Sequence, residues 1–102
     1  MHNTKNLGIA ELLAPYRDAI LRLAEQCHVT NIRVFGSVAR GEASPDSDID
    51  LLVNFPTGYK LRDHIHFTAD LKALLGRSVD VVIEQNLREE YRPYILKDAI
   101  PL

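Results

Sequence analysis

Two aspartates separated by one residue, Asp48 and Asp50, stand at the start of a run, residues 49–55, that is otherwise almost wholly apolar and β-prone. If this run is a strand, its period of two places both carboxylates on one face and the apolar side chains on the other. Carboxylates this close repel each other unless a cation lies between them, and proteins commonly hold Mg²⁺ through one or two carboxylates together with substrate phosphates. The pair therefore indicates a metal site on one face of a strand whose other face builds the core.

A Gly-Ser pair, Gly36 and Ser37, precedes these aspartates by ten intervening residues and follows another apolar run, residues 32–35. The residues after it look like the first turn of a helix, where exposed N–H groups bind phosphate oxygens. Gly36 lets a ligand approach the backbone closely, and Ser37 can cap the turn and donate its hydroxyl. Either half of the pattern is weak alone, but the two halves in this order between two strands indicate a site for a metal ion and a phosphate compound.

Arg40 follows the short helical turn and leads into a loop, residues 43–47, that consists of turn-forming residues. Its guanidinium can contact a phosphate of the ligand, or it can hold the loop in place by pairing with Glu42 or Asp46. The sequence leaves both alternatives open.

A third carboxylate is available in the next apolar run, residues 78–84. Asp80 alternates with two valines, so on a strand it points away from them and can share the face of Asp48 and Asp50. Glu84 lies on the same face, two side chains further along, and competes for this role. Its position at the end of the run favours a solvated or cap-adjacent group, so Asp80 is the predicted third carboxylate.

Apolar residues at a spacing of three and four predict two amphipathic helices, within residues 7–27 and over residues 61–75. Pro15 places the start of the first regular helix near itself, because proline fits the first turn of a helix and not the later ones. Gly76 is suited to end the second helix as a C-cap. A final short helix is expected over residues 93–99.

The predicted order is helix, strand, short helix, strand, helix, strand, helix. This order is typical of an α/β (α+β) fold with a small mixed β-sheet and helices packed on one face. The carboxylates would then lie on the other face of the sheet. A length of 102 residues gives room for one core, so residues 1–102 are expected to form a single domain.

The overall composition limits which kinds of partner the protein can bind and where in the cell it is expected to be found. The formal net charge is −2, and no dense group of lysines and arginines is present, so we expect no direct binding to long nucleic acid. The single cysteine, Cys27, cannot form an internal disulfide. No signal sequence or apolar span of membrane length is visible, so the protein is expected to be cytoplasmic and without contact to a membrane.

Two tyrosines near the C-terminus, Tyr91 and Tyr94, alternate with the arginines Arg88 and Arg92. They can pack into the core beneath a solvated charged face, or they can form an amphipathic contact surface. Core packing is the prediction, because apolar residues at helical spacing more often face a core.

Taken together, the chain resembles the minimal nucleotidyltransferases (MNT) of the DNA polymerase β-like superfamily. The signature of that superfamily is Gly-Ser, ten residues, Asp-x-Asp and a later third carboxylate, and Gly36, Ser37, Asp48 and Asp50 match it at the same spacing. The surrounding sequence, GSVARGEASPDSDIDLLV, is especially similar to the small MNT antitoxins that act beside HEPN-domain ribonuclease toxins. The resemblance covers nearly the whole chain, and Asp80 stands at the place of the third carboxylate.

This resemblance implies the polymerase β-like nucleotidyltransferase fold and a Mg²⁺-dependent reaction, with two ions held by Asp48, Asp50 and Asp80. ATP would bind with its β- and γ-phosphates at Gly36 and Ser37. AMP would pass to a hydroxyl, by resemblance that of a tyrosine, on a HEPN-domain toxin in complex with this chain, and the modification would silence the toxin.

Two other functions compete with this expectation. The chain can be a non-catalytic antitoxin that neutralises its partner by binding alone, or a small-molecule nucleotidyltransferase subunit of the antibiotic-modifying kind. An intact set of three carboxylates favours the enzyme, because nothing in a pure binding module requires them to be aligned.

Overall fold

The strands lie where the apolar runs predict them, and they pair into one sheet. The computed structural model describes residues 7–102 of the chain. Its strands are β1 (Thr30–Phe35), β2 (Ile49–Asn54), β3 (Val79–Ile83) and β4 (Ile100–Pro101). Their order in the sheet is β3-β2-β1-β4, with β2 and β3 parallel and β1 antiparallel to both of its neighbours. The predicted mixed sheet is therefore confirmed, with β3 and β4 at its edges.

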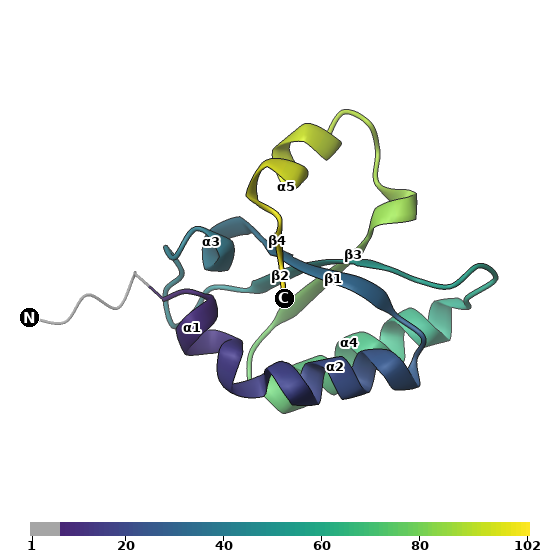
Figure 1. The fold of residues 1–102 in the computed structure, drawn as a ribbon, viewed down its shortest axis with the longest axis horizontal. Coiled ribbons are helices and arrows are strands. Elements are labelled where there is room, and N and C mark those ends of the chain that lie inside the picture. The colour runs from purple at the N-terminus through teal and green to yellow at the C-terminus, as the bar shows by residue number, and fades with distance from the viewer. Residues whose placement is uncertain (1–6) are drawn as a thin grey trace, which may run out of the picture.

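The helices fall on both sides of this sheet. They are α1 (Ile9–Leu12), η1 (Ala14–Tyr16), α2 (Arg17–Gln26), α3 (Gly36–Ala39), α4 (Leu61–Leu75), η2 (Glu84–Asn86) and α5 (Arg92–Asp98). Figure 1 shows α2 and α4 together on one side of the strands and α5 on the other. Over residues 7–102, no helix has the length and apolar character needed to cross a membrane.

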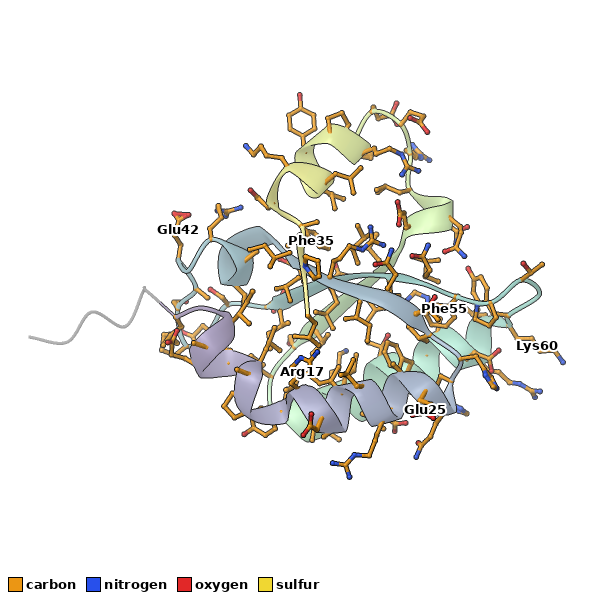
Figure 2. All side chains as sticks on the ribbon, viewed as in Figure 1. Arg17, Glu25, Phe35, Glu42, Phe55 and Lys60 are labelled. Carbon is orange, nitrogen blue, oxygen red and sulfur yellow. The ribbon has the colours of Figure 1, made fainter. Side chains whose placement is uncertain are left out.

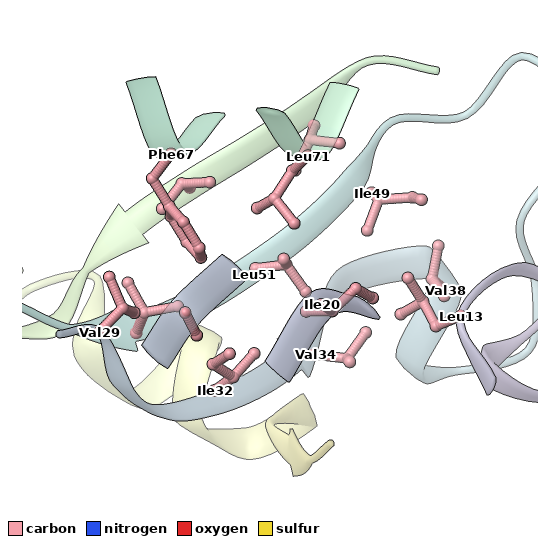
Figure 3. Close-up of a cluster of buried hydrophobic side chains, with 14 of the residues drawn as sticks. Leu13, Ile20, Val29, Ile32, Val34, Val38, Ile49, Leu51, Phe67 and Leu71 are labelled. Carbon is pink, nitrogen blue, oxygen red and sulfur yellow. The ribbon is translucent and has the colours of Figure 1, made fainter. Parts of the chain in front are cut away.

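The main core fills the space between the sheet and the two helices α2 and α4 (Figure 3). The strands contribute the side chains of Ile32, Val34, Ile49, Leu51, Val53, Val79, Val81 and Ile83, and the two helices contribute Ile20, Ala24, Phe67 and Leu71. Burial of a large apolar side chain stabilises a fold by about 1.5–3 kcal/mol, so this alternation of buried positions holds each strand in its register. Asp50 and Asp80 are thereby fixed on the opposite face of the sheet.

The opposite face is partly covered by α5. Leu52, which lies on that face, is fully buried although it does not belong to the main core, and α5 lies on that side of the sheet (Figure 1). The helices α2 and α4 form the layer that the sequence predicts on one face, and α5 adds a smaller layer on the other. Asp80, on the same face, remains exposed.

The predicted helix boundaries at Pro15 and Gly76 are confirmed. Pro15 lies in η1, and the regular helix α2 starts at Arg17. Helix α4 covers residues 61–75 and ends at Gly76, whose φ of 67° lies in the left-handed region and whose N–H donates to the carbonyl of Lys72 at 2.9 Å. Glycine adopts this conformation without the steric cost of a side chain.

The sequence pattern did not indicate the last strand, β4. It consists of Ile100 and Pro101, which pair with Val34 and Arg33 of β1. Two residues are too few to show an alternating pattern, and a proline normally argues against a strand because it cannot donate to the ladder. Pro101 is tolerated here because β4 lies at the edge of the sheet.

Candidate active site

The register of β2 and β3 brings two of the predicted carboxylates together. Asp50 and Asp80 are Cα partners in this parallel pair, and neighbouring strands lie about 4.8 Å apart. Both side chains project from the face opposite the core, since Ile49 and Leu51 point into the core. On the other side of β2, Asp50 is paired with Phe35, the last residue of β1. Asp50 is therefore central, with the third strand on one side and the Gly-Ser turn on the other.

The backbone of Gly36 lies directly against the carboxylate of Asp50. Gly36 has a φ of 73°, and a Cβ placed on it would overlap Asp50 Oδ2 and lie 3.3 Å from Asp50 Cγ. Only glycine fits a left-handed turn in such close contact with another group. The turn leads into α3, which Val38 anchors by complete burial. Phe35 and Glu42 lie on either side of α3 (Figure 2).

Ser37 follows in the first turn of α3 and is half-buried. Its carbonyl accepts a hydrogen bond from the N–H of Glu42 at 2.9 Å, which closes the turn toward the following loop. The structure thus places Gly36 and Ser37 beside Asp50, and the role of this turn in phosphate binding stays a prediction.

The site carries an excess of negative charge, because its carboxylates outnumber the basic side chains near them. Burial, followed by the nearby Asp80 and Asp48 carboxylates, raises the pKa of Asp50 from 3.8 to about 6, and Arg40 has a smaller effect in the lowering direction. Asp48 itself is exposed just before β2. Asp50 therefore carries its negative charge at neutral pH against a free-energy cost, which a bound cation would remove.

This cost predicts that Asp50→Asn stabilises the protein when no metal or nucleotide is present. The folded state binds the Asp50 proton more tightly than the unfolded state, so wild-type stability falls as pH rises from about 4 to about 6. The variant lacks this loss, so its free energy of unfolding at pH 7 should exceed that of the wild type by about 1–2 kcal/mol. This figure is smaller than the full free energy of the pKa shift because Asp50 is partly solvated. Urea unfolding of the variant and the wild type at pH 4 and pH 7, in the presence of a chelator, measures this difference in stability. A difference between variant and wild type that is the same at both pH values would contradict the assignment.

Arg40 pairs with two carboxylates. Its Nε donates to Glu42 Oε1 at 2.9 Å, and its NH1 donates to Asp98 Oδ2 at 2.7 Å. The predicted alternative of pairing with Glu42 is thus present, whereas among the described residues Asp46 forms no ion pair with it. The contact with Asp98 was not expected and ties α3 to the end of α5. Phosphate contact by Arg40 stays a prediction, because half of this side chain is still exposed.

Glu84, the competitor for the third carboxylate, is the first residue of η2 and therefore lies next to the helix cap, one of the two predicted alternatives, and arginines hold its carboxylate. Its Oε1 accepts from Arg33 NH2 at 2.5 Å, and its Oε2 accepts from Arg92 NH1 at 3.3 Å. The hydrogen bond from Arg33 holds the pKa of Glu84 below its usual value. Arg33 alternates with Ile32 and Val34 in β1, so the strand pattern could have placed it on this face. The charge of Glu84 is already compensated within the protein.

The arrangement fits a divalent cation that also has ligands from a substrate. Among residues 7–102, no three acidic, histidine or cysteine side chains are grouped closely enough to hold a metal ion by themselves. Asp50 and Asp80 form a paired set of hard oxygen donors with uncompensated charge, with Asp48 close enough to act on Asp50. Mg²⁺ is commonly bound in this way, through one or two carboxylates plus phosphate oxygens. The part of Asp48 in metal binding stays a prediction.

Known proteins are similar to this chain in sequence and in fold. The sequence model of the family described as "Nucleotidyltransferase domain" matches residues 16–102. The protein adenylyltransferase MntA of Thermococcus cleftensis is 40% identical over 78 residues, which are 76% of this chain and 79% of that protein. A solved structure described as that of a minimal nucleotidyltransferase has a TM-score of 0.79 and 48% identity, covering 88% of this chain and 92% of the other.

A more distant likeness concerns the fold alone. The complex of a tri-AMPylated Shewanella oneidensis HEPN toxin with its MNT antitoxin contains a chain that matches with a TM-score of 0.66 and 17% identity, over 85% of this chain and 68% of that one. The resemblance read from Gly36, Ser37, Asp48 and Asp50 is thus confirmed at the level of the family. The chain belongs to the nucleotidyltransferase domain family, as a minimal nucleotidyltransferase.

Proposed function

We propose that this chain transfers AMP from ATP, with Mg²⁺, to a tyrosine hydroxyl of a HEPN-domain ribonuclease toxin and thereby acts as its antitoxin. The observation that carries the proposal is the placement of Asp50 between Asp80 and the backbone of Gly36. The candidate acidic ligands for a cation thus lie next to the Gly-Ser turn that is predicted to bind the phosphates. The MntA relative, whose name states protein adenylylation, and the complex with an AMPylated HEPN toxin support the donor and the partner.

The roles of the residues follow from this placement. The Gly36–Ser37 turn receives the β- and γ-phosphates, and the missing Cβ of Gly36 leaves room for the Asp50 carboxylate to lie against the same turn. Asp48, Asp50 and Asp80 are the ligands that would hold Mg²⁺. When bound, the ion stabilises the negative charge that develops on the phosphate oxygens and positions the reacting groups.

The reaction is an exchange of one phosphorus–oxygen bond for another. The acceptor oxygen forms a bond to the α-phosphorus of ATP, the bond from that phosphorus to the bridging oxygen breaks, and pyrophosphate leaves. Asp80 accepts the proton of the acceptor hydroxyl, because it is the exposed carboxylate at the outer side of Asp50. Positioning and charge neutralisation supply most of the acceleration.

The test is label transfer in the reconstituted pair. The chain and its HEPN partner are incubated with Mg²⁺ and ATP labelled at the α-phosphate, and in parallel at the γ-phosphate. We expect label on the toxin from the α-position alone, none in the presence of EDTA, and none with Asp48→Asn although this variant still forms the complex.

Two results would contradict the proposal. Label from the γ-position would show phosphorylation in place of nucleotide transfer. Full protection of cells from the toxin by Asp48→Asn, with no label transferred, would show that binding alone neutralises the toxin.

A further inference from the structure

The two acidic partners of Arg40 differ in how firmly they hold it. NH1 donates to Asp98 Oδ2 at 2.7 Å, and Nε donates to Glu42 Oε1 at 2.9 Å. The side chain of Asp98 is 15% exposed and that of Glu42 is 59% exposed. Water screens an exposed ion pair more than a covered one, so the exposed pair contributes little. The hydrogen bond to Asp98, followed by that to Glu42, raises the pKa of Arg40. Asp98 is therefore the firm partner, and Glu42 is the one that another anion can replace.

Asp98 lies on the face of α5 that is turned toward the sheet. Arg92, Ile95 and Asp98 follow each other at every third position and are the partly buried residues of this helix. Tyr94 is 72% exposed, and Tyr91, just before the helix, is 54% exposed. The prediction that the two tyrosines pack into the core is wrong, because the other face of α5 is the one turned inward. That inner face ends with the carboxylate of Asp98, where α5 contacts α3.

The position of Asp98 is unfavourable for the helix to which it belongs. Asp98 is the last residue of α5, and the helix dipole disfavours a negative charge at this end. The guanidinium of Arg40 offsets that charge. Removal of the carboxylate therefore costs α5 little, and variants at this position are expected to fold.

Arg40 connects this carboxylate with the candidate active site. It follows α3 directly, and its backbone N–H donates to the carbonyl of Gly36 at 3.2 Å. Its charge acts on Asp50, whose pKa it lowers against the larger raising effects of burial and the neighbouring carboxylates. A guanidinium has five N–H donors, and over residues 7–102 no hydrogen bond from NH2 of Arg40 is recorded. Arg40 thus has donors left for an anion at the Gly-Ser turn while Asp98 holds it.

We infer that Asp98 is a positioning residue for nucleotide binding, because it holds the guanidinium of Arg40 beside the Gly-Ser turn. Arg40 there contacts the phosphates of ATP, and Glu42 gives way to them. This inference rests on the proposed function, since it needs a phosphate chain at this turn. Arginine binds phosphate through N–H groups in a fixed planar arrangement. A guanidinium that is already oriented loses less conformational freedom on binding, so a firm partner raises the affinity and a replaceable one does not.

The experiment measures binding of a non-hydrolysable ATP analogue, with Mg²⁺, to variants of the full chain by calorimetry. Asp98→Ala should weaken binding by about fivefold, the effect of leaving one long side chain free to move. Glu42→Gln is the matched control, because it removes the other partner of the same arginine. It should bind the analogue as tightly as the wild type or up to about threefold more tightly. Inorganic triphosphate should show the same ratios, since the contact concerns the phosphates.

A double-variant comparison separates positioning from a merely structural role of α5. In an Arg40→Ala background, Asp98→Ala should change the affinity for the analogue by less than about twofold, because no guanidinium remains to be positioned. An equal loss in both backgrounds would mean that Asp98 acts through the packing of α5 and would overturn the inference.

Three further outcomes would also overturn it. Tighter binding by Asp98→Ala would show that this carboxylate competes with the phosphates for Arg40. A loss in Glu42→Gln as large as in Asp98→Ala would remove the difference between the two partners. An effect with the analogue that is absent with triphosphate would place Asp98 near the nucleoside.

Nucleotide binding also distinguishes this inference from the proposed function. If the wild type binds the analogue with the expected dependence on Asp98 but transfers no label to the toxin, the proposed transfer is refuted and the role of Asp98 stands. If the wild type binds neither the analogue nor triphosphate in the presence of Mg²⁺, both are refuted.

Discussion

Asp80→Asn is expected to reduce AMP transfer to the toxin by about 1,000-fold or more, whereas Glu84→Gln retains most of the transfer. Asparagine preserves the size of Asp80 and removes both its negative charge and its ability to take a proton. Asp80 lies next to Asp50 in the β2–β3 register and is exposed to an incoming acceptor. Glu84 lies at the other end of the same face, where Arg33 and Arg92 already compensate its charge.

For stability we expect the opposite order, with Glu84→Gln the more damaging of the two substitutions. Glu84→Gln leaves the largely buried guanidinium of Arg33 without its charged acceptor, and the loss of such a bond costs about 1–3 kcal/mol. Because the folded state holds the pKa of Glu84 below its unfolded value, this contribution is present above the unfolded pKa and is lost as pH falls through the folded one. Asp80→Asn breaks no hydrogen bond or ion pair recorded for the described residues and removes a carboxylate that repels Asp50, so its free energy of unfolding should stay the same or rise slightly.

The measurement pairs toxin labelling at saturating ATP with urea unfolding of each variant. Nucleotide affinity of Asp80→Asn should fall less than its turnover, because the Gly-Ser turn still holds the phosphates. If Glu84→Gln abolishes transfer while Asp80→Asn remains active, the third carboxylate is Glu84 and the assignment of Asp80 is wrong.

The alternation of residue types in the strands was enough to place Asp50 and Asp80 on one face, whereas Asp48 lies just before β2. The valines on either side of Asp80 and the apolar neighbours of Asp50 are buried in the core, as their periodicity predicts. Periodicity gives the face of a strand and says nothing about which strand lies next to it. That Asp50 and Asp80 are adjacent required the strand order β3-β2-β1-β4.

The pairing partners of the charged side chains could not be predicted from the sequence for a related reason. Arg40 bonds to Asp98, which is 58 residues away in the sequence, and Arg33 bonds to Glu84, which is 51 away. The Arg40–Asp98 contact depends on the side of the sheet on which α5 packs, and a seven-residue helix carries too little periodicity to indicate this. The Arg33–Glu84 contact depends on the strand order, which places β1 and β3 on the two sides of β2. Local pairing of Arg40 with Glu42 was predictable because the two residues are neighbours in one turn.

Gly36→Ala is expected to remove activity by about 100-fold or more, with a smaller effect on stability than on turnover. The added Cβ would overlap Asp50 Oδ2, and the Asp50 side chain can relieve the overlap only by turning its carboxylate away from its present position. A carboxylate displaced by about 1 Å from its productive position is enough for a loss of this size. Label transfer to the toxin and urea unfolding measure the two effects.

Gly58→Ala is the matched control, because Gly58 also has a positive φ, 80°, and a Cβ there would meet nothing within 4 Å. Both variants share the cost of placing a side chain in the left-handed region, about 1–2 kcal/mol. Only Gly36→Ala collides with Asp50, so only it should lose activity.

In an Asp50→Ala background the nearest remaining side-chain atom is Cβ of residue 50, at 3.5 Å from the new methyl group. There Gly36→Ala should destabilise the protein no more than Gly58→Ala does, since the overlap that couples the turn to the carboxylate is gone. An equal loss of activity in Gly58→Ala would place the effect in the backbone alone and would remove Asp50 from the explanation.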